Sequence, residues 1–274
     1  MRRFIARCGG RPARAFGYSE PAVTSTPFVT MGFVVLPLLV AAGFVLACDA
    51  ADRWLGERVD VRRRRTMKIG AAVLAWLLLT TLAAASGVLR RFDAFPPPFA
   101  GLLLAILALG IGVACSPLGT RLLCGLPLWV LVGSQVFRFP LELLMHEASV
   151  IGLMPVQMSY SGQNYDIVTG ISAGLLGWWL ARGRVPRWIV AAWNVLGFAL
   201  LVNVVTVAIV STPIFQWFGP DRVNTFVTYP PFVWLPAVLV TAALIGHLLV
   251  WRKLRLERLS AAALGGGRGM GARL

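Results

Sequence analysis

The feature that most constrains this chain is a series of long apolar runs separated by charged or Pro-rich segments. A helix that crosses a bilayer needs about 20 apolar residues, because the hydrocarbon core is about 30 Å thick and each helical residue rises about 1.5 Å. Helices suit that environment because they satisfy their own backbone hydrogen bonds without water. The sequence therefore predicts an all-α bundle of about seven transmembrane helices, at 28–47, 69–89, 99–118, 121–154, 167–181, 188–210 and 232–251.

Composition agrees with a membrane protein and argues against a nucleic-acid-binding one. The chain is 58% hydrophobic and only 14% charged, which is far from the composition of a soluble domain of 274 residues. Its net charge of +15 comes largely from basic residues that flank the apolar runs, where they set orientation and contact anionic lipid headgroups. None of the four Cys has the spacing of a zinc site or a redox motif, so no cofactor is predicted. The apolar composition makes the lipid bilayer the expected partner.

The ends of the chain differ in composition from the apolar centre. We expect a basic, disordered tail at 1–27, a transmembrane domain at 28–254 and a Gly-rich tail at 255–274. An alternative start at Met31 stays open, because the apolar run begins only at Phe28.

The distribution of Lys and Arg predicts the orientation of the bundle. These residues are most numerous in the first, third and fifth connections and in the C-terminal tail, and four consecutive arginines occupy 62–65. The positive-inside rule then places the C-terminus in the cytoplasm and the N-terminus outside. We expect a multi-pass protein of the bacterial inner membrane, with 49–68 as a charged loop whose arginines contact lipid headgroups.

The fourth run is unusually long and contains a proline. We interpret 121–154 as one helix that is kinked at Pro140, because proline removes a backbone donor and clashes with the preceding turn. A span that ends near Phe139, followed by a helix lying on the membrane surface, is an alternative. The fifth run, 167–181, is short for a bilayer, so its lead-in is expected to be partly buried.

Four polar residues of the fourth run recur at helical spacing. Gln135, Arg138, Glu142 and His146 are three, four and four residues apart, which places them on one face of a helix. A charge at mid-bilayer costs about 2.5–3.5 kcal/mol, so such residues usually face the bundle interior and mark a functional site.

The spacing of Arg138 and Glu142 predicts an ion pair within one helix. Two interpretations of this pair remain open. It could be a structural pair that holds the kink. Alternatively, it could line a cavity in which Arg138 binds an anionic group and Glu142 takes a proton or cation, and Glu142 is then the one catalytic candidate.

The loop that follows, 158–166, is polar and aromatic. Gly162 permits a tight turn, and Asp166 is placed to cap the next helix. We expect the loop to fold back over the mouth of the bundle, because irregular backbone at membrane depth is tolerated only against protein or a wet cavity. The predicted ligand-binding residues are Gln135, Arg138, Glu142, His146, Gln163, Asn164 and Asp166.

A metal site is not predicted. His146, Glu142 and Glu147 lie near one another in the sequence, but their spacing matches no known ligand signature. The other histidine, His247, lies toward the opposite end of its own run, at a different depth from His146. We interpret it as a core or interfacial residue.

Two further patterns are interpreted as structural. Gly170, Gly174 and Gly177 form a small-residue stripe, which predicts close helix packing. Asn194 and Asn203 are nine residues apart, on opposite faces of one helix, so they are expected to make separate inter-helix hydrogen bonds.

Two segments resemble a pattern in a family of bacterial multi-pass membrane proteins. These are 137–143, which reads Phe-Arg-Phe-Pro-Leu-Glu-Leu, and the loop that holds Met158, Gly162, Asn164, Asp166 and Ile167. The loop of that family reads roughly Met-Thr-Phe-x-Gly-x-Asn-Phe-Asp-Ile, and here Ser159, Tyr160 and Tyr165 replace its Thr and two Phe. The resemblance covers about the latter half of the chain. It implies a multi-pass fold and supports the position of the site, and it implies no activity.

We expect a protein that binds or moves a small amphipathic or anionic ligand through a polar pocket in the outer half of the bundle. An intramembrane enzyme that acts on a lipid or isoprenoid, with Glu142 as general acid, is the first alternative. A structural subunit of a membrane complex is the second. The sequence does not distinguish these, nor does it give the ligand or the oligomeric state.

Overall fold

The computed structural model describes residues 27–270, with side chains up to residue 259. Within this range the chain consists of helices joined by turns, without strands. The predicted tail at 1–27 lies almost wholly outside the described residues. The α-helices are α1 (Pro27–Trp54), α2 (Val59–Ala85), α3 (Pro98–Cys115), α4 (Pro117–Gly125), α5 (Leu128–Gly133), α6 (Arg138–Val150), α7 (Ile167–Arg182), α8 (Arg187–Val210) and α9 (Thr241–Met270).

Short segments of other helical types occupy the connections and two positions inside the long apolar stretches. The 3₁₀ segments are η1 (Val88–Arg90), η2 (Ser134–Phe137), η3 (Val156–Met158), η4 (Pro220–Arg222) and η5 (Phe226–Thr228), and η6 (Leu235–Val240) is a π-helical segment that leads into α9.

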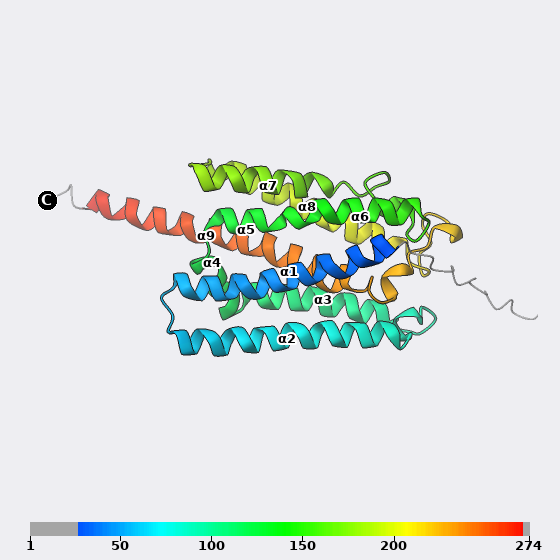
Figure 1. Cartoon of the computed structure of the whole chain (residues 1–274). Coiled ribbons are helices and arrows are strands. Elements are labelled where there is room, and N and C mark those ends of the chain that lie inside the picture. The colour runs from blue at the N-terminus through cyan, green and yellow to red at the C-terminus, as the bar shows by residue number, and fades with distance from the viewer. Residues whose placement is uncertain (1–26, 271–274) are drawn as a thin grey trace, which may run out of the picture.

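The long helices run side by side, with their connections gathered at the two ends of the bundle (Figure 1). Six apolar helical stretches in the described range are long enough to cross a membrane: Pro27–Trp54, Val59–Ala85, Pro98–Cys115, Leu128–Val150, Arg187–Val210 and Leu235–Leu259. The seventh predicted run forms α7, which has only 16 residues. The fold is therefore an all-helical bundle with the character of a multi-pass membrane protein.

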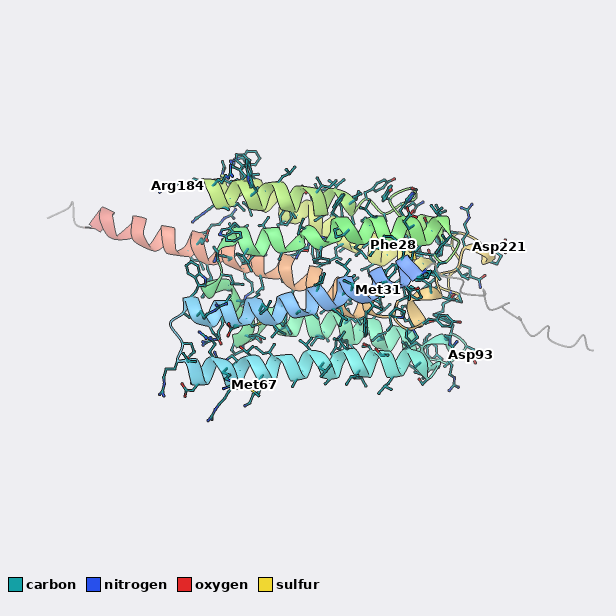
Figure 2. All side chains as sticks on the ribbon, viewed as in Figure 1. Phe28, Met31, Met67, Asp93, Arg184 and Asp221 are labelled. Carbon is teal, nitrogen blue, oxygen red and sulfur yellow. The ribbon has the colours of Figure 1, made fainter. Side chains whose placement is uncertain are left out.

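The surface of the bundle has the polarity expected against lipid. Large apolar side chains such as Leu39, Leu82 and Leu104 are more than 60% exposed, and they would be costly against water. Charged residues gather at the ends, where Figure 2 places Asp93 and Asp221 at one end and Arg184 at the other. The interior is organised around α9 and the segment that leads into it. In the most apolar part of the stretch Leu235–Leu259, 72% of the residues are buried, against 17% in that of α2.

The charged segment 49–68 is mostly helical, which corrects the prediction of a loop. Helix α1 continues to Trp54 and α2 begins at Val59, so the turn between them is only four residues long. Ion pairs across this turn explain the extension: Arg62 contacts Asp49 at 3.0 Å, and Arg65 contacts Asp52 at 2.6 Å. Arg63 and Arg64 are exposed and face away from these pairs.

The predicted single helix at 121–154 is in fact divided. Helix α4 ends at Gly125, and Pro127 separates it from α5. The 3₁₀ turn η2 then lies one turn before Pro140. Proline has no N–H to donate to the carbonyl four residues earlier, so the regular α-helical hydrogen bond is missing in this turn. The predicted kink at Pro140 stays a prediction, since α6 continues through this residue from Arg138 to Val150. The start of the predicted helix, by contrast, belongs to the separate short helix α4, which ends at Gly125. From Leu128 to Val150 the chain forms one apolar stretch of 23 residues.

The glycine stripe of α7 packs as predicted. A Cβ atom on Gly170 would overlap the backbone nitrogen of Phe139, and one on Gly177 would lie 2.9 Å from the Cα atom of Gly133. Glycine at these positions therefore lets α7 lie directly against α5, η2 and the start of α6. Helix α9 continues to Met270, so helical structure extends through most of the segment that composition marks as a Gly-rich tail.

Candidate functional site

Arg138, the first residue of α6, is the centre of a polar cluster inside the bundle. It is 1% exposed. Its Nε donates to Asp166 Oδ2 over 2.5 Å, and its Nη1 donates to His247 Nε2 over 2.8 Å. A longer bond of 3.4 Å joins Nη1 to the carbonyl of Gly197. One guanidinium thus connects α6 with the start of α7, with α8 and with α9.

The hydrogen bonds of His247 define its tautomer. A guanidinium can only donate, so His247 Nε2 must accept from Arg138 and the ring proton must lie on Nδ1. That proton is donated to Asn194 Oδ1 over 2.8 Å, and Asn194 Nδ2 in turn donates to the backbone carbonyl of His247 over 3.1 Å. The imidazole is therefore neutral and held by three elements of the bundle.

Asn164 connects the carboxylate of Glu142 with the backbone of Asp166. Its Nδ2 donates to Glu142 Oε1 over 2.7 Å and to the carbonyl of Met158 over 3.0 Å. Its Oδ1 accepts from the backbone N–H of Asp166 over 3.1 Å. Asn164 is fully buried, as is Ser159. The predicted burial of this loop is confirmed at these residues.

The six side chains Arg138, Glu142, Asn164, Asp166, Asn194 and His247 are here called the Arg138 cluster. All are 3% exposed or less. Three of its polar atoms, Arg138 Nη2, Glu142 Oε2 and Asp166 Oδ1, are buried and have no hydrogen-bond partner within residues 27–259. The cluster also holds one guanidinium and two carboxyl groups. It is neutral only if one carboxyl group is protonated or a cation is bound.

The predicted ion pair between Arg138 and Glu142 is wrong. Arg138 pairs with Asp166, and Glu142 bonds to Asn164. The physical reason is the close approach at Gly170, which brings α7 against Phe139 and so places Asp166, one turn earlier, beside Arg138. Asp166 does precede α7 as predicted, but its carboxylate makes no hydrogen bond to the helix N-terminus.

Three predicted site residues lie outside the cluster. His146 is partly exposed, lies 2.9 Å from Ser161 Oγ through its Nδ1 and stacks on Tyr160 at 4.5 Å between ring centroids. Gln163 is exposed, and its bonds are made by its backbone: its carbonyl accepts from Asn203 and its N–H donates to the carbonyl of Gln157. Gln135 is buried, but it packs against Gly246 and does not bond to the cluster.

Two residues of the cluster were missed by the sequence prediction. His247 and Asn194 each stand in an apolar run, and the cost of burying a polar group would have marked both as candidates. Their partnership with Arg138 could not be read from spacing, because His247 lies 109 positions away from it. Gly197 leaves room for the His247 ring beside α8, since a Cβ atom at Gly197 would lie 2.6 Å from the imidazole Cε1.

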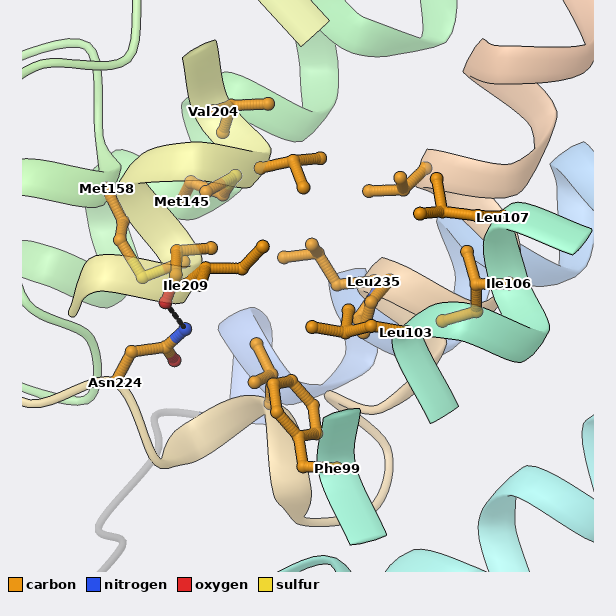
Figure 3. Close-up of a pocket in the computed structure, with 15 residues that line it drawn as sticks. Phe99, Leu103, Ile106, Leu107, Met145, Met158, Val204, Ile209, Asn224 and Leu235 are labelled. Atoms are coloured by element: carbon orange, nitrogen blue, oxygen red, sulfur yellow. Dashed lines mark hydrogen bonds between the residues drawn. The ribbon is translucent and has the colours of Figure 1, made fainter. Parts of the chain in front are cut away.

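The bundle also encloses a small apolar cavity of about 70 Å³ (Figure 3). Met145 and Met158 line one side of it, and Phe99, Leu103 and Leu235 line other sides. Its one polar side chain, Asn224, donates to the carbonyl of Ala208 over 3.1 Å. The residues that line this cavity are therefore almost all apolar, and none of them belongs to the Arg138 cluster.

The polar groups do not form a metal site. Within the part of the chain that the structure describes, three or more His, Cys, Asp or Glu side chains nowhere converge as metal ligands. No protein-family model, curated protein or solved structure matches the chain. The interpretation of the site therefore depends on its own geometry.

Proposed function

We propose that this chain is a multi-pass protein of the bacterial inner membrane that binds or moves a small amphipathic or anionic ligand through the Arg138 cluster. The observation that carries the proposal is the set of three buried polar atoms without partners: Arg138 Nη2, Glu142 Oε2 and Asp166 Oδ1. Buried polar groups in proteins are nearly always satisfied, so such a group needs a specific explanation. A ligand or ion that completes their hydrogen bonds is that explanation.

The roles of the individual groups follow from their charges. Arg138 Nη2 is a free donor that can bind an anionic or carbonyl oxygen of the ligand. Glu142 Oε2 is a free oxygen that can take the proton or cation by which the cluster becomes neutral. A ligand that arrives together with a proton would satisfy both groups at once, as in ion-coupled membrane proteins whose intramembrane charges line a pathway.

The proposal includes the topology. We infer that α7 completes a seventh span, because the buried residues that precede it, Asn164 and Asp166, lengthen the part of the chain within the bundle. The basic residues of the α1–α2 turn, of α4 and of the end of α9 then lie in the cytoplasm by the positive-inside rule. The Arg138 cluster lies on the path of a ligand that enters from the outer side.

The test is native mass spectrometry of the protein purified in mild detergent, comparing the wild type with Glu142→Gln. The matched control is Glu147→Gln, which alters an exposed glutamate of the same helix. We expect a bound small molecule in the wild type and in the control, with at least a tenfold loss in Glu142→Gln. Equal occupancy in all three proteins, or a wild type without any bound molecule, would contradict ligand binding by the cluster.

A second candidate function is an intramembrane enzyme that acts on a lipid or isoprenoid, with Glu142 as general acid. The observation in its favour is a second buried carboxyl group in the cluster, that of Asp166, whose backbone N–H bonds to the same Asn164 side chain that donates to Glu142. The same experiment separates the two functions. An enzyme that lacks its acid would retain unconverted substrate in Glu142→Gln, whereas a binding protein would lose its ligand.

A further inference from the structure

A second cavity, of about 440 Å³, opens on the side of the bundle between α1 and α5. We call it the lateral groove. Its mouth is formed by exposed residues such as Leu39 and Gly43 of α1, and its floor by the buried Ile245, Gly246 and Leu249 of α9. This volume lies within the range of about 300–1,000 Å³ that is common for small-molecule sites.

The position of the lateral groove determines what can reach it. Both walls belong to helices that are long and apolar enough to span a membrane, and the mouth lies on their lipid-facing sides. The residues that line it include no charged side chain. A phospholipid headgroup would find no counter-charge there, whereas a hydrocarbon chain would meet walls that are apolar except at Ser134 and Gln135.

One polar group in the lateral groove has no partner. Gln135, which lines its inner wall, is 1% exposed, and its Oε1 accepts no hydrogen bond from any residue between 27 and 259. An amide oxygen can only accept, so the missing partner is a donor such as a hydroxyl group. The Gln135 amide is held in place by Gly246, where a Cβ atom would overlap its Nε2.

We propose that the lateral groove binds one uncharged lipid, with its hydrocarbon chain between α1 and α5 and a hydroxyl group that donates to Gln135 Oε1. The lipid enters sideways from the bilayer and does not need the Arg138 cluster. The apolar chain supplies most of the affinity through buried area, and the hydrogen bond selects an alcohol over an alkane of equal length. The proposal therefore goes beyond the function assigned to the Arg138 cluster.

Photo-crosslinking in phosphatidylcholine nanodiscs tests this site. The probe is a long-chain primary alcohol with a diazirine in its chain, and labelled peptides are identified by mass spectrometry. We expect labelling of α1, α5 and α9 around the groove. Excess unlabelled hexadecanol should compete for this labelling, and hexadecane should compete at least threefold less well.

Two variants and two controls complete the test. Gly43→Trp fills the mouth, and a side chain fits there because nothing lies within 4 Å of a Cβ atom. Gly101→Trp is the matched control, since Gly101 of α3 is equally open and does not line the groove. Gln135→Leu removes the acceptor and should lower labelling about three- to tenfold, the effect of one hydrogen bond.

The outcomes separate this proposal from the function of the cluster. Loss of labelling in Gly43→Trp and Gln135→Leu, with retention in Gly101→Trp and Glu142→Gln, supports the groove site. Labelling that is unchanged in Gly43→Trp, or that spreads evenly over the exposed faces of α2 and α3, would show ordinary surrounding lipid and overturn it. Because Glu142→Gln is expected to retain the groove label, failure of one proposal does not imply failure of the other.

Discussion

Two charged clusters lie at different depths of the bundle and are built differently. The end cluster consists of Asp52, Glu57, Arg65 and Arg121, at the end of the molecule where α1, α2 and α4 meet (Figure 1). Asp52 accepts from Arg65 over 2.6 Å and from Arg121 over 2.7 Å, and Arg121 also bonds to Glu57. Two arginines balance two carboxylates, and all four side chains have partners.

The Arg138 cluster lacks both of these properties. It has one guanidinium for two carboxyl groups, and three of its buried atoms have no partner within the described residues. The arginine side chains of the end cluster are about 30% exposed, whereas that of Arg138 is 1% exposed. Removing a charge from water costs more at the deeper site. The comparison teaches that the charged groups at the bundle end find all their partners within the fold, whereas those of the deeper cluster do not find all of theirs within the described residues.

Arg121 of the end cluster keeps its charge over a wide pH range. The hydrogen bond from Arg121 to Asp52 raises the pKa of the Arg121 guanidinium above its ordinary value. Arg121 therefore stays protonated at any pH at which the protein is folded. A permanent charge is useful for holding helices together, whereas a site that exchanges protons needs a group such as Glu142.

The largest expected effect is that of Asp166→Asn, which removes the charged partner of Arg138. Breaking this buried pair leaves the Arg138 guanidinium without its direct partner, which should lower the stability of the fold by about 3–5 kcal/mol. Thermal unfolding in detergent, followed by the loss of monodisperse protein, measures this change. Glu142→Gln serves as the control and should be nearly neutral, because it removes the surplus negative charge. A stable Asp166→Asn protein would show that Arg138 does not depend on this pair.

A smaller effect is expected from Asp52→Asn in the end cluster. The variant loses two charge-assisted hydrogen bonds, but both arginines can reach water, so we expect a cost of about 1.5–3 kcal/mol. The same unfolding assay measures it. Ligand occupancy in native mass spectrometry should stay at the wild-type level, since this cluster has a structural role. A loss of ligand in properly folded Asp52→Asn would remove the functional contrast between the clusters.

The smallest of the three effects on stability is expected from Gly170→Ala. Its new methyl group meets the backbone of Phe139, so α7 must move away from α6 at a cost of about 1–3 kcal/mol. That displacement also separates Asp166 from Arg138, so ligand occupancy should fall more than stability does. Gly174→Ala is the matched control, because its nearest neighbour is a side-chain methyl of Val136 at 3.4 Å. An equal loss of ligand occupancy in the two variants would show that the helix contact at Gly170 does not position the cluster.

The features that the sequence predicted well are those set by local pattern. Apolar runs long enough to span a bilayer became helices, and the polar residues Arg138, Glu142, Asn164 and Asp166 came together because burying them apart would be costly. The glycine stripe also predicted the close packing of α7. Each of these predictions needed only the spacing of residues within one segment.

The features that it did not predict depend on partners far apart in the chain. The spacing of four favoured a bond between Arg138 and Glu142, but the approach of α7 offered Asp166 instead. His247 was placed outside the site because its depth was judged from its position within one run. The segment 49–68 was taken as a loop because its charges were counted without the partners that neutralise them on the neighbouring helix.

The adjacency of Gly246 and His247 on α9 connects the two proposed sites. Gly246 supports the Gln135 amide in the lateral groove, and His247 accepts from Arg138. A small rotation or sliding of α9 would therefore change both contacts together. By thermodynamic reciprocity, if the two proposed sites bind as described and the lipid favours one position of α9, the lipid would change the affinity of the cluster for its ligand, and the ligand would change the affinity for the lipid by the same factor. Membrane composition would then act as an effector of the protein.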